Sequence, residues 1–117
     1  MISPDIKKLW TRKPKHKYKA VRCERDGKKF PSKLERSYYD RLSVLQRSGH
    51  VVFFIRQVPF DLPGNTRYFA DFCIFFDSGD VEFVDCKGKM TPTSNMKIKQ
   101  VEDLYPVKIK IVTAKDL

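Results

Sequence analysis

The chain contains two acidic side chains and one lysine whose spacing could place them around a single divalent cation. Asp71 lies within an apolar segment, and Asp85 follows 14 residues later, two positions before Lys87. An ionised carboxylate in so apolar a segment is costly unless it is paired or bound to a metal. Mg²⁺ prefers oxygen ligands, lowers the pKa of a coordinated water and neutralises charge on a phosphate. The residues therefore allow two interpretations equally: a site for phosphodiester hydrolysis, or a structural ion pair at a strand end.

These side chains can meet because their segments are predicted to be neighbouring antiparallel strands. Segments 67–76 and 81–87 are rich in aromatic and β-branched residues, and residues 77–80 form a turn between them. Side chains two positions apart on a strand point to the same face, about 6.6 Å apart at Cα. Asp85 and Lys87 therefore project together. The lysine ammonium could orient the attacking water and stabilise the developing charge.

The other segments predict an α/β fold with a mixed sheet flanked by helices. Asp26-Gly27 is a strong signal for a two-residue turn within a hairpin over residues 20–30. Segment 51–62 is a further strand. Segment 107–112 alternates as a last strand, which follows a helix and can lie parallel to an earlier strand. The most apolar segment, 67–76, is expected to be a central strand with both faces covered.

Two helices are expected. Ser32 is a natural N-cap for the first helix, and Gly49 provides the left-handed residue that ends it. A loop and the second helix occupy segment 91–105. The side chains expected to face inward are Leu34, Tyr38, Leu42 and Leu45 on the first helix, and Met96, Ile98, Val101 and either Leu104 or Tyr105 on the second.

Glu35 has two candidate roles. It stands three residues after Ser32, which is the spacing of a capping box in which the glutamate side chain bonds back to the cap amide. This structural role explains the residue without any metal, and the residues alone favour it. The second role is contact with a metal ion, and it depends on a family resemblance described below.

The formal net charge of +10 is concentrated near the N-terminus. Residues 1–36 contain 13 Lys or Arg and four Asp or Glu, whereas residues 37–117 are nearly neutral. A polyanion is the expected partner, with nucleic acid first and an anionic membrane surface second, and a solubilising tail is the alternative. The side chains expected to contact DNA are Lys13, Lys15, Lys17, Lys19, Gln57, Lys89, Lys97 and Lys99, with a solvated helix face as the alternative for the last two.

Length and composition argue against several classes of protein. A chain of 117 residues is expected to form one domain, residues 20–117, after a basic arm at residues 1–19. No apolar run approaches the length of about 20 residues that spans a bilayer. The three cysteines include no CxxC pair, which indicates neither a disulfide framework nor a zinc site and favours a reducing cytoplasm.

Five short motifs follow one another along the chain. They are Asp26-Gly27, Ser32-Lys33-Leu34-Glu35, Gln57-Val58-Pro59, Tyr68-Phe69-Ala70-Asp71-Phe72 and Asp85-Cys86-Lys87-Gly88. Their order and spacing resemble the PD-(D/E)xK nuclease superfamily, and about residues 18–112 are similar to small phage-encoded nucleases within it. Two positions depart from the pattern. The second acid is Asp where many members have Glu, and Ala70 replaces the proline that gives the superfamily its name.

This resemblance implies a restriction-endonuclease-like core that hydrolyses phosphodiester bonds with Mg²⁺, for which Mn²⁺ can substitute. It assigns metal ligation to Asp71, Asp85 and the backbone carbonyl of Cys86. It also makes Lys87 the catalytic lysine and brings Glu35 to the metal from the first helix. Because Asp85 is one methylene shorter than the usual Glu, the metal must lie nearer the strand.

The expected function is that of a DNA endonuclease in the host-cell cytoplasm, acting in phage DNA recombination, replication or processing. So small a chain has no room for a separate sequence-reading domain, which favours selection of branched or junction DNA by its shape. Cutting of both strands would favour a homodimer. Two alternatives remain: a non-catalytic nucleic-acid-binding module of the same fold, and a nuclease subunit that needs a partner protein.

Overall fold

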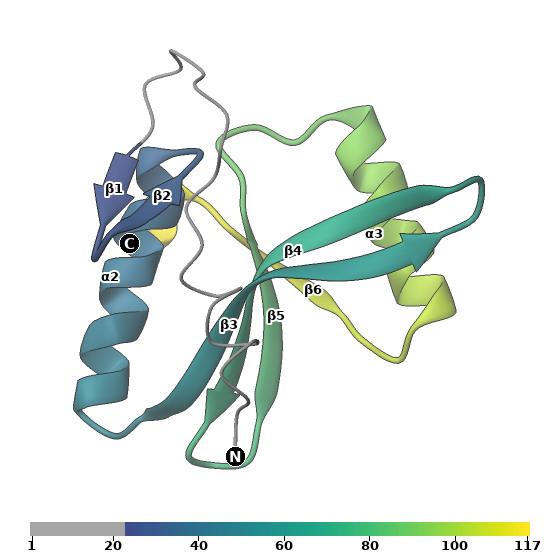
Figure 1. The fold of residues 1–117 in the computed structure, drawn as a ribbon. Coiled ribbons are helices and arrows are strands. Elements are labelled where there is room, and N and C mark those ends of the chain that lie inside the picture. The colour runs from purple at the N-terminus through teal and green to yellow at the C-terminus, as the bar shows by residue number, and fades with distance from the viewer. Residues whose placement is uncertain (1–22) are drawn as a thin grey trace, which may run out of the picture.

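The computed structural model describes residues 23–117, which form a four-stranded mixed sheet with two helices and a separate hairpin (Figure 1). The strands of the sheet lie in the order β3-β4-β5-β6. The expected α/β fold with a mixed sheet and flanking helices agrees with this architecture. The elements are β1 (Cys23–Arg25), β2 (Lys28–Phe30), α2 (Lys33–Arg47), β3 (Val51–Leu62), β4 (Thr66–Phe76), β5 (Val81–Cys86), α3 (Pro92–Leu104), β6 (Ile109–Val112) and the short 3₁₀ helix η1 (Ala114–Asp116).

The sheet is antiparallel except at its last strand. β3 pairs with β4 and β4 pairs with β5 in antiparallel ladders, whereas β5 and β6 are parallel. Parallel neighbours need a crossover connection, and α3 lies within this one. The bounds of β3 are those predicted from the sequence, and β6 begins two residues later than predicted. β5 ends at Cys86, so that Lys87 follows the strand directly.

Local sequence signals determine the ends of the hairpin and of α2. Asp26 and Gly27 have positive φ values of 53° and 74°, as the predicted two-residue turn requires. Ser32 Oγ accepts a hydrogen bond from the backbone amide of Glu35 at 3.1 Å, which caps the helix. Gly49, with φ of 87°, follows the helix in the left-handed conformation. These three predictions are confirmed.

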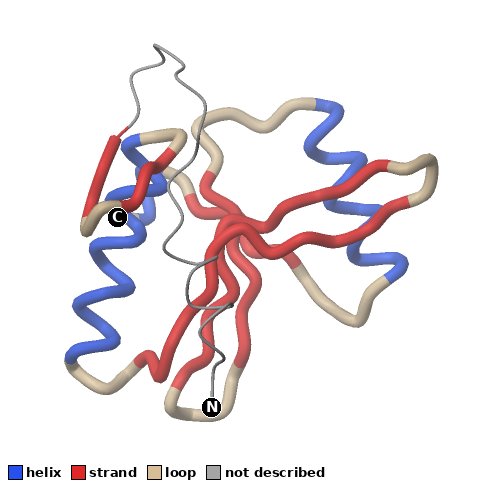
Figure 2. Tube along the Cα trace, viewed as in Figure 1, coloured by secondary structure: helices blue, strands red, loops and turns tan. Residues whose placement is uncertain are grey.

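Two hydrophobic clusters hold the helices against different ends of the sheet (Figure 2). The α2 cluster consists of Phe30, Tyr38, Tyr39, Leu42, Val51, Phe72, Ile74, Val84 and Val112. The α3 cluster consists of Phe60, Leu62, Tyr68, Ala70, Ile98, Val101 and Ile109. Burial of these side chains is the main favourable contribution to folding, and it determines where each helix lies.

The prediction that Met96 faces inward is wrong, because this side chain is exposed. The buried stripe of α3 passes through Ile98 and Val101, and Met96 lies off that stripe. Of the two alternatives at the end of the helix, Leu104 is exposed. Tyr105 packs against the α3 cluster instead.

β4 changes its neighbours at Asp71. Ala70 belongs to the α3 cluster, whereas Phe72, which projects from the same face of the strand, belongs to the α2 cluster. Asp71 and Gln57, whose φ is 54°, both lie between the paired positions Arg56–Phe72 and Val58–Ala70. A left-handed residue bends its strand, and the sheet twists strongly here (Figure 2). The arm formed by residues 57–71 of β3 and β4 therefore separates from β5.

The separation of this arm corrects one prediction about β4. The strand is internal, as expected, but its two faces are not both covered along its length. Phe69 is 48% exposed. The last pair between β4 and β5 is Phe72 with Val84, so the first half of β4 pairs only with β3. α3 covers one face of that half and leaves the other face open.

Candidate active site

Asp71 and Asp85 meet where β4 and β5 stop pairing. The register of the ladder continues from the pair Phe72–Val84 to Asp71 and Asp85, but side-chain hydrogen bonds replace the backbone ladder there. The backbone amide of Asp71 donates to Asp85 Oδ1 at 3.3 Å. The backbone amide of Cys86 donates to Asp71 Oδ2 at 2.9 Å. Each acid is thus bonded to the backbone of the opposite strand, and the predicted antiparallel placement of these strands is confirmed.

Asp85 is buried and holds two further partners. Its side chain is 1% exposed, and Oδ2 accepts a hydrogen bond from the Tyr68 hydroxyl. The ammonium of Lys87 lies 3.4 Å from the same oxygen. Burial raises the pKa of the Asp85 carboxyl, and the charge of Lys87 partly opposes that rise. Asp85 and Lys87 project together, as their spacing predicts.

Lys87 joins the buried acid to the surface. Its side chain is 25% exposed, whereas the Asp85 carboxylate beside it is buried. The backbone amide of Lys87 donates to the Val112 carbonyl at 2.9 Å, which attaches the end of β5 to β6. The lysine is therefore positioned by the backbone on one side and by a carboxylate on the other. Its ammonium group remains within reach of a bound anion.

Glu35 points into the sheet and not back to its own N-cap. Its side chain is 2% exposed, and Oε2 accepts hydrogen bonds from Arg56 Nη2 at 3.3 Å and Gln57 Nε2 at 3.4 Å. Ser32 caps α2 alone through the Glu35 amide. Burial and, after it, the nearby negative charge of Asp71 raise the pKa of Glu35, Arg56 opposes both effects, and the resulting pKa is about 7. The carboxylate is thus part of the acidic cluster.

Gln57 joins two of the acids. Its Nε2 donates to Glu35 Oε2 and, at 3.2 Å, to Asp71 Oδ1. The left-handed backbone of Gln57 turns the strand at this point, directly opposite Asp71. The sequence predicts contact of this exposed side chain with DNA, and the structure adds a second role for it. One amide group supplies hydrogen-bond donors to two carboxylates that would otherwise repel each other.

Cys86 contributes its backbone and not its thiol. Burial and, after it, the negative charges of Asp71 and Glu35 together raise the pKa of the thiol to about 12. The thiol therefore stays protonated and is a poor metal ligand. The Cys86 amide already bonds Asp71 Oδ2. Ligation of a metal by the Cys86 carbonyl stays a prediction from the family resemblance.

The described residues contain a cluster of acids but no ready coordination shell. Within residues 23–117, no three His, Cys, Asp or Glu side chains are placed as a group that could hold a metal ion. Asp71 and Asp85 share hydrogen bonds with the backbone, and Glu35 reaches Asp71 through the Gln57 amide. All the donor atoms offered are carboxylate oxygens, which suit a hard cation such as Mg²⁺. Side-chain movement would have to bring the third acid closer.

Two further side chains hold the site, and no role is expected for either of them from the sequence alone. Tyr68 lies at an apolar position of β4, where a buried hydroxyl needs a partner, and it donates to Asp85. Arg56 lies on β3, with its guanidinium 4.0 Å from the centre of the Phe30 ring and Nη2 3.0 Å from the Lys29 carbonyl. The alternation of β3 does mark Arg56 as inward-facing. Its acidic partner could not be identified without the fold.

The predicted DNA contacts lie in three places. Lys89 is exposed in the loop between β5 and α3, close in sequence to Lys87. On α3, Lys97 is half-buried and Lys99 is exposed. The remaining four lysines fall outside the described residues 23–117, and they are Lys13, Lys15, Lys17 and Lys19.

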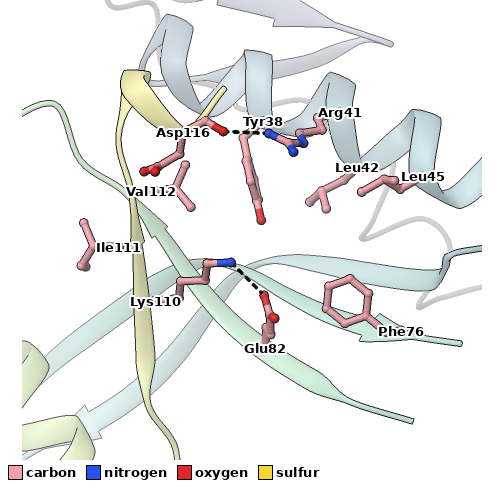
Figure 3. A pocket seen from close by; sticks show the side chains of 10 residues that line it. All are labelled: Tyr38, Arg41, Leu42, Leu45, Phe76, Glu82, Lys110, Ile111, Val112 and Asp116. Carbon is pink, nitrogen blue, oxygen red and sulfur yellow. Dashed lines mark hydrogen bonds and ion pairs between the residues drawn. The ribbon is translucent and has the colours of Figure 1, made fainter. Parts of the chain in front are cut away.

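A pocket of about 450 Å³ lies away from the acids, between α2 and the strands β5 and β6 (Figure 3). Its charged groups are already paired. Arg41 Nη1 donates to the Asp116 carbonyl at 2.8 Å, and the Lys110 ammonium lies 3.7 Å from Glu82. Burial raises the pKa of Tyr38 in its wall to about 12, so this hydroxyl stays protonated. The pocket offers no reactive group comparable to the acidic cluster.

Comparison with known proteins identifies one family. Residues 15–116 match the family described as "Protein of unknown function (DUF1064)". No curated protein matches the chain. Among the helices of residues 23–117, none has both the length and the apolar character needed to cross a membrane.

Proposed function

We propose that this chain, which belongs to the DUF1064 family, is a Mg²⁺-dependent DNA endonuclease that hydrolyses phosphodiester bonds. The observation that supports this proposal is the arrangement of Asp71, Asp85 and Lys87 where β4 and β5 separate. The two acids exchange hydrogen bonds with each other's strand, and the lysine ammonium lies 3.4 Å from Asp85. A structural ion pair explains Asp85 and Lys87, but it does not explain why further acids gather beside them.

The acidic cluster fits a divalent cation by its charge and by its donor atoms. Asp71 raises the pKa of Glu35, which means that the two carboxylates repel each other in the folded protein. A cation between them would remove this repulsion. Asp71, Asp85, Glu35 and the Cys86 carbonyl would hold the ion, and water would complete its shell. When bound, Mg²⁺ supplies charge neutralisation at the phosphate and makes a coordinated water more acidic, and Mn²⁺ can replace it.

The other residues of the site have roles that follow from their contacts. Lys87 pairs with Asp85 and is partly exposed, so its ammonium can stabilise the negative charge that develops on the phosphate. Tyr68 holds one oxygen of Asp85, and the Asp71 amide holds the other. Arg56 partly neutralises Glu35. Asp71 and Asp85 are therefore held in fixed orientations before substrate arrives, which reduces the reorganisation needed during the reaction, whereas Glu35 would have to move closer to them.

The charge distribution supports DNA as the substrate. The net charge is +10, most of it within residues 1–36, and a polyanion compensates such a surplus. The motif order that resembles PD-(D/E)xK nucleases supports the same assignment. The proposal includes selection of branched or junction DNA by its shape, in phage recombination, replication or processing. The site geometry favours this function over a purely structural cluster because three acids share one small region.

Cleavage assays on two pairs of variants test the proposal. We expect Asp85→Asn and Lys87→Met each to lower the rate at least about 10²-fold, the size typical of losing a principal electrostatic group. Asp103→Asn and Lys110→Met are the matched controls, because Asp103 is exposed on α3 and Lys110 forms an ion pair away from the acids. Both controls should keep the wild-type rate. The substrates are junction, flap, gapped and linear DNA with Mg²⁺.

Binding of the same DNA in EDTA separates catalysis from folding. The Asp85→Asn and Lys87→Met proteins should still bind, because binding depends mainly on the basic residues. If the wild type binds DNA but cuts none of these substrates with Mg²⁺ or Mn²⁺, a nucleic-acid-binding module replaces the proposal. If activity appears only after addition of a cell extract, the chain is a nuclease subunit that requires a partner.

A further inference from the structure

An exposed aromatic side chain lies beside the acids on the open face of β4. Phe69 is two residues from Asp71, so the two side chains project from the same face of the strand, about 6.6 Å apart at Cα. The neighbours of Phe69 along the strand, Tyr68 and Ala70, are buried against α3. Phe69 itself is 48% exposed. The fold therefore presents a phenyl ring next to a candidate metal ligand.

The open face carries a short strip of side chains around this ring. Across the ladder, the partner of Phe69 is Pro59, which is also exposed. The next position on this face is occupied by Gln57, opposite Asp71. The strip thus passes from an apolar pair directly to the acidic cluster. Because the pairing of β4 with β5 ends at Phe72, no strand of the described residues pairs with this part of β4 on the edge away from β3.

A second exposed phenylalanine shows what is unusual about this position. Phe53 is 46% exposed, nearly as much as Phe69. Its ring stacks on Phe75 with centroids 4.4 Å apart. Within residues 23–117, the Phe69 ring pairs with no other aromatic ring. A single exposed apolar side chain is ordinary, but this ring is exposed, has no aromatic partner within residues 23–117 and lies two residues from Asp71.

We infer that Phe69 stacks on an unpaired base of DNA next to the phosphate that is cut, and this inference rests on the proposed function. Because the Cα atoms of Phe69 and Asp71 lie only about 6.6 Å apart, a phosphate bound at the acids would bring the adjoining nucleotide close to the Phe69 ring. Bases inside a duplex already stack on each other, whereas an unpaired base has a free face for an aromatic ring. The substrate class is therefore DNA with an unpaired nucleotide at the cleavage position, such as a flap, a gap or the branch point of a junction.

Binding of single-stranded and duplex DNA to two matched variants tests this inference. Fluorescence anisotropy in EDTA measures affinity without cleavage. We expect Phe69→Leu to weaken binding of a single-stranded oligonucleotide roughly 10-fold, as for the loss of one base–aromatic stack, and to change duplex binding little. Phe53→Leu removes a similarly exposed ring from another part of the sheet, and it should change the affinity for neither single-stranded nor duplex DNA. Leucine keeps each position apolar, and circular dichroism confirms the fold.

A fluorescent adenine analogue that is quenched by stacking adds a second measurement. Placed at the unpaired position of a flap, it should be quenched by the wild type and by Phe53→Leu but not by Phe69→Leu. Equal weakening of single-stranded and duplex binding, or unchanged quenching in Phe69→Leu, would overturn the inference.

The same experiments distinguish failure of the inference from failure of the proposed function. If the wild type cuts DNA and Phe69→Leu cuts flap and duplex in the wild-type ratio, the stacking role is wrong and the nuclease assignment stands. If the wild type cuts nothing but Phe69→Leu selectively loses single-stranded binding, the stacking surface stands as a binding site and the nuclease assignment falls.

Discussion

At the scale of single residues, Glu35 shows how a position in the fold changes the role of a side chain. It occupies the third position of a helix whose N-cap is Ser32, where a glutamate commonly bonds back to the cap. Here the carboxylate turns toward β3 and accepts from Arg56 and Gln57. Near-complete burial beside Asp71 makes its negative charge costly, which raises its pKa to about 7.

The raised pKa of Glu35 predicts a pH-dependent stability. Between pH 4.5 and about 7, the folded protein keeps a proton on Glu35 that the unfolded chain has released. The Glu35 contribution to the free energy of unfolding is therefore greatest below this window and falls as pH rises through it, by at most about 3 kcal/mol. Glu35→Gln cannot titrate, so its stability relative to wild type should increase from the acid to the neutral end. Urea unfolding at both ends measures this difference.

The comparison with the variant isolates Glu35, because the raised pKa of Asp85 changes wild type and variant in the same direction. A stability difference between wild type and Glu35→Gln that does not vary with pH would contradict the buried, repelled state of this carboxylate. Addition of Mg²⁺ at the neutral end should favour the wild type, since the glutamine lacks the charge that attracts the ion.

At the scale of elements, the left-handed residue of β3 coincides with the place where the β3–β4 arm (residues 57–71) and β5 separate. Gln57 has φ of 54°, a left-handed conformation that residues other than glycine adopt only at a cost. Its amide compensates by bonding Glu35 and Asp71. The strand therefore keeps a strained backbone at the position where its side chain meets the acids, a combination often found at functional sites.

Two substitutions at Gln57 separate backbone strain from side-chain contacts. Both Gln57→Ala and Gln57→Gly remove the amide, but only glycine adopts the left-handed conformation freely. We expect Gln57→Gly to be more stable than Gln57→Ala by about 1 kcal/mol, the reverse of the usual order of these residues within a strand. Thermal or urea unfolding measures the difference. Greater stability of the alanine variant would mean that the bend is not present in solution.

At the scale of the whole molecule, the two helices pack on either side of one turning point of the sheet. α2 packs on the end of the sheet that contains Phe72 and Val84. α3 packs on the β3–β4 arm, residues 57–71, and on Ile109 of β6. The acids lie between these two packed regions. Neither the α2 cluster nor the α3 cluster includes the acids. Polar groups can therefore lie between the two clusters without removing apolar side chains from the core.

The basic residues predict a strong dependence of DNA binding on salt. Each lysine that contacts a phosphate contributes about 0.9 to the slope of log K against log salt for duplex DNA. Replacing Lys13, Lys15, Lys17 and Lys19 by Gln should therefore reduce the slope by about 3.6 if all four make such contacts. Anisotropy titrations over a range of salt measure it. Replacing Lys108, Lys110 and Lys115 by Gln is the control and should leave the slope unchanged. An unchanged slope in the variant of the four N-terminal lysines would exclude the basic arm, residues 1–19, from the DNA interface.

The sequence by itself determined the elements and their local signals. The turn at Asp26-Gly27, the cap at Ser32 and the stop at Gly49 depend on residues that are close together in the chain, and each is as predicted. The alternation of apolar residues likewise predicts the strands and places Asp85 and Lys87 on one side of β5. Interactions over a few residues are readable from sequence because the backbone geometry fixes which neighbours meet.

Only the tertiary structure decided which distant groups meet at the site. The hydrogen bond from Tyr68 to Asp85, the partners of Glu35 on β3 and the exposure of Phe69 all depend on where β4 leaves β5. That point coincides with one left-handed residue, Gln57, which has no glycine or turn motif to mark it. A contact between segments far apart in the chain is set by the packing of whole elements, and no local pattern of residues encodes it.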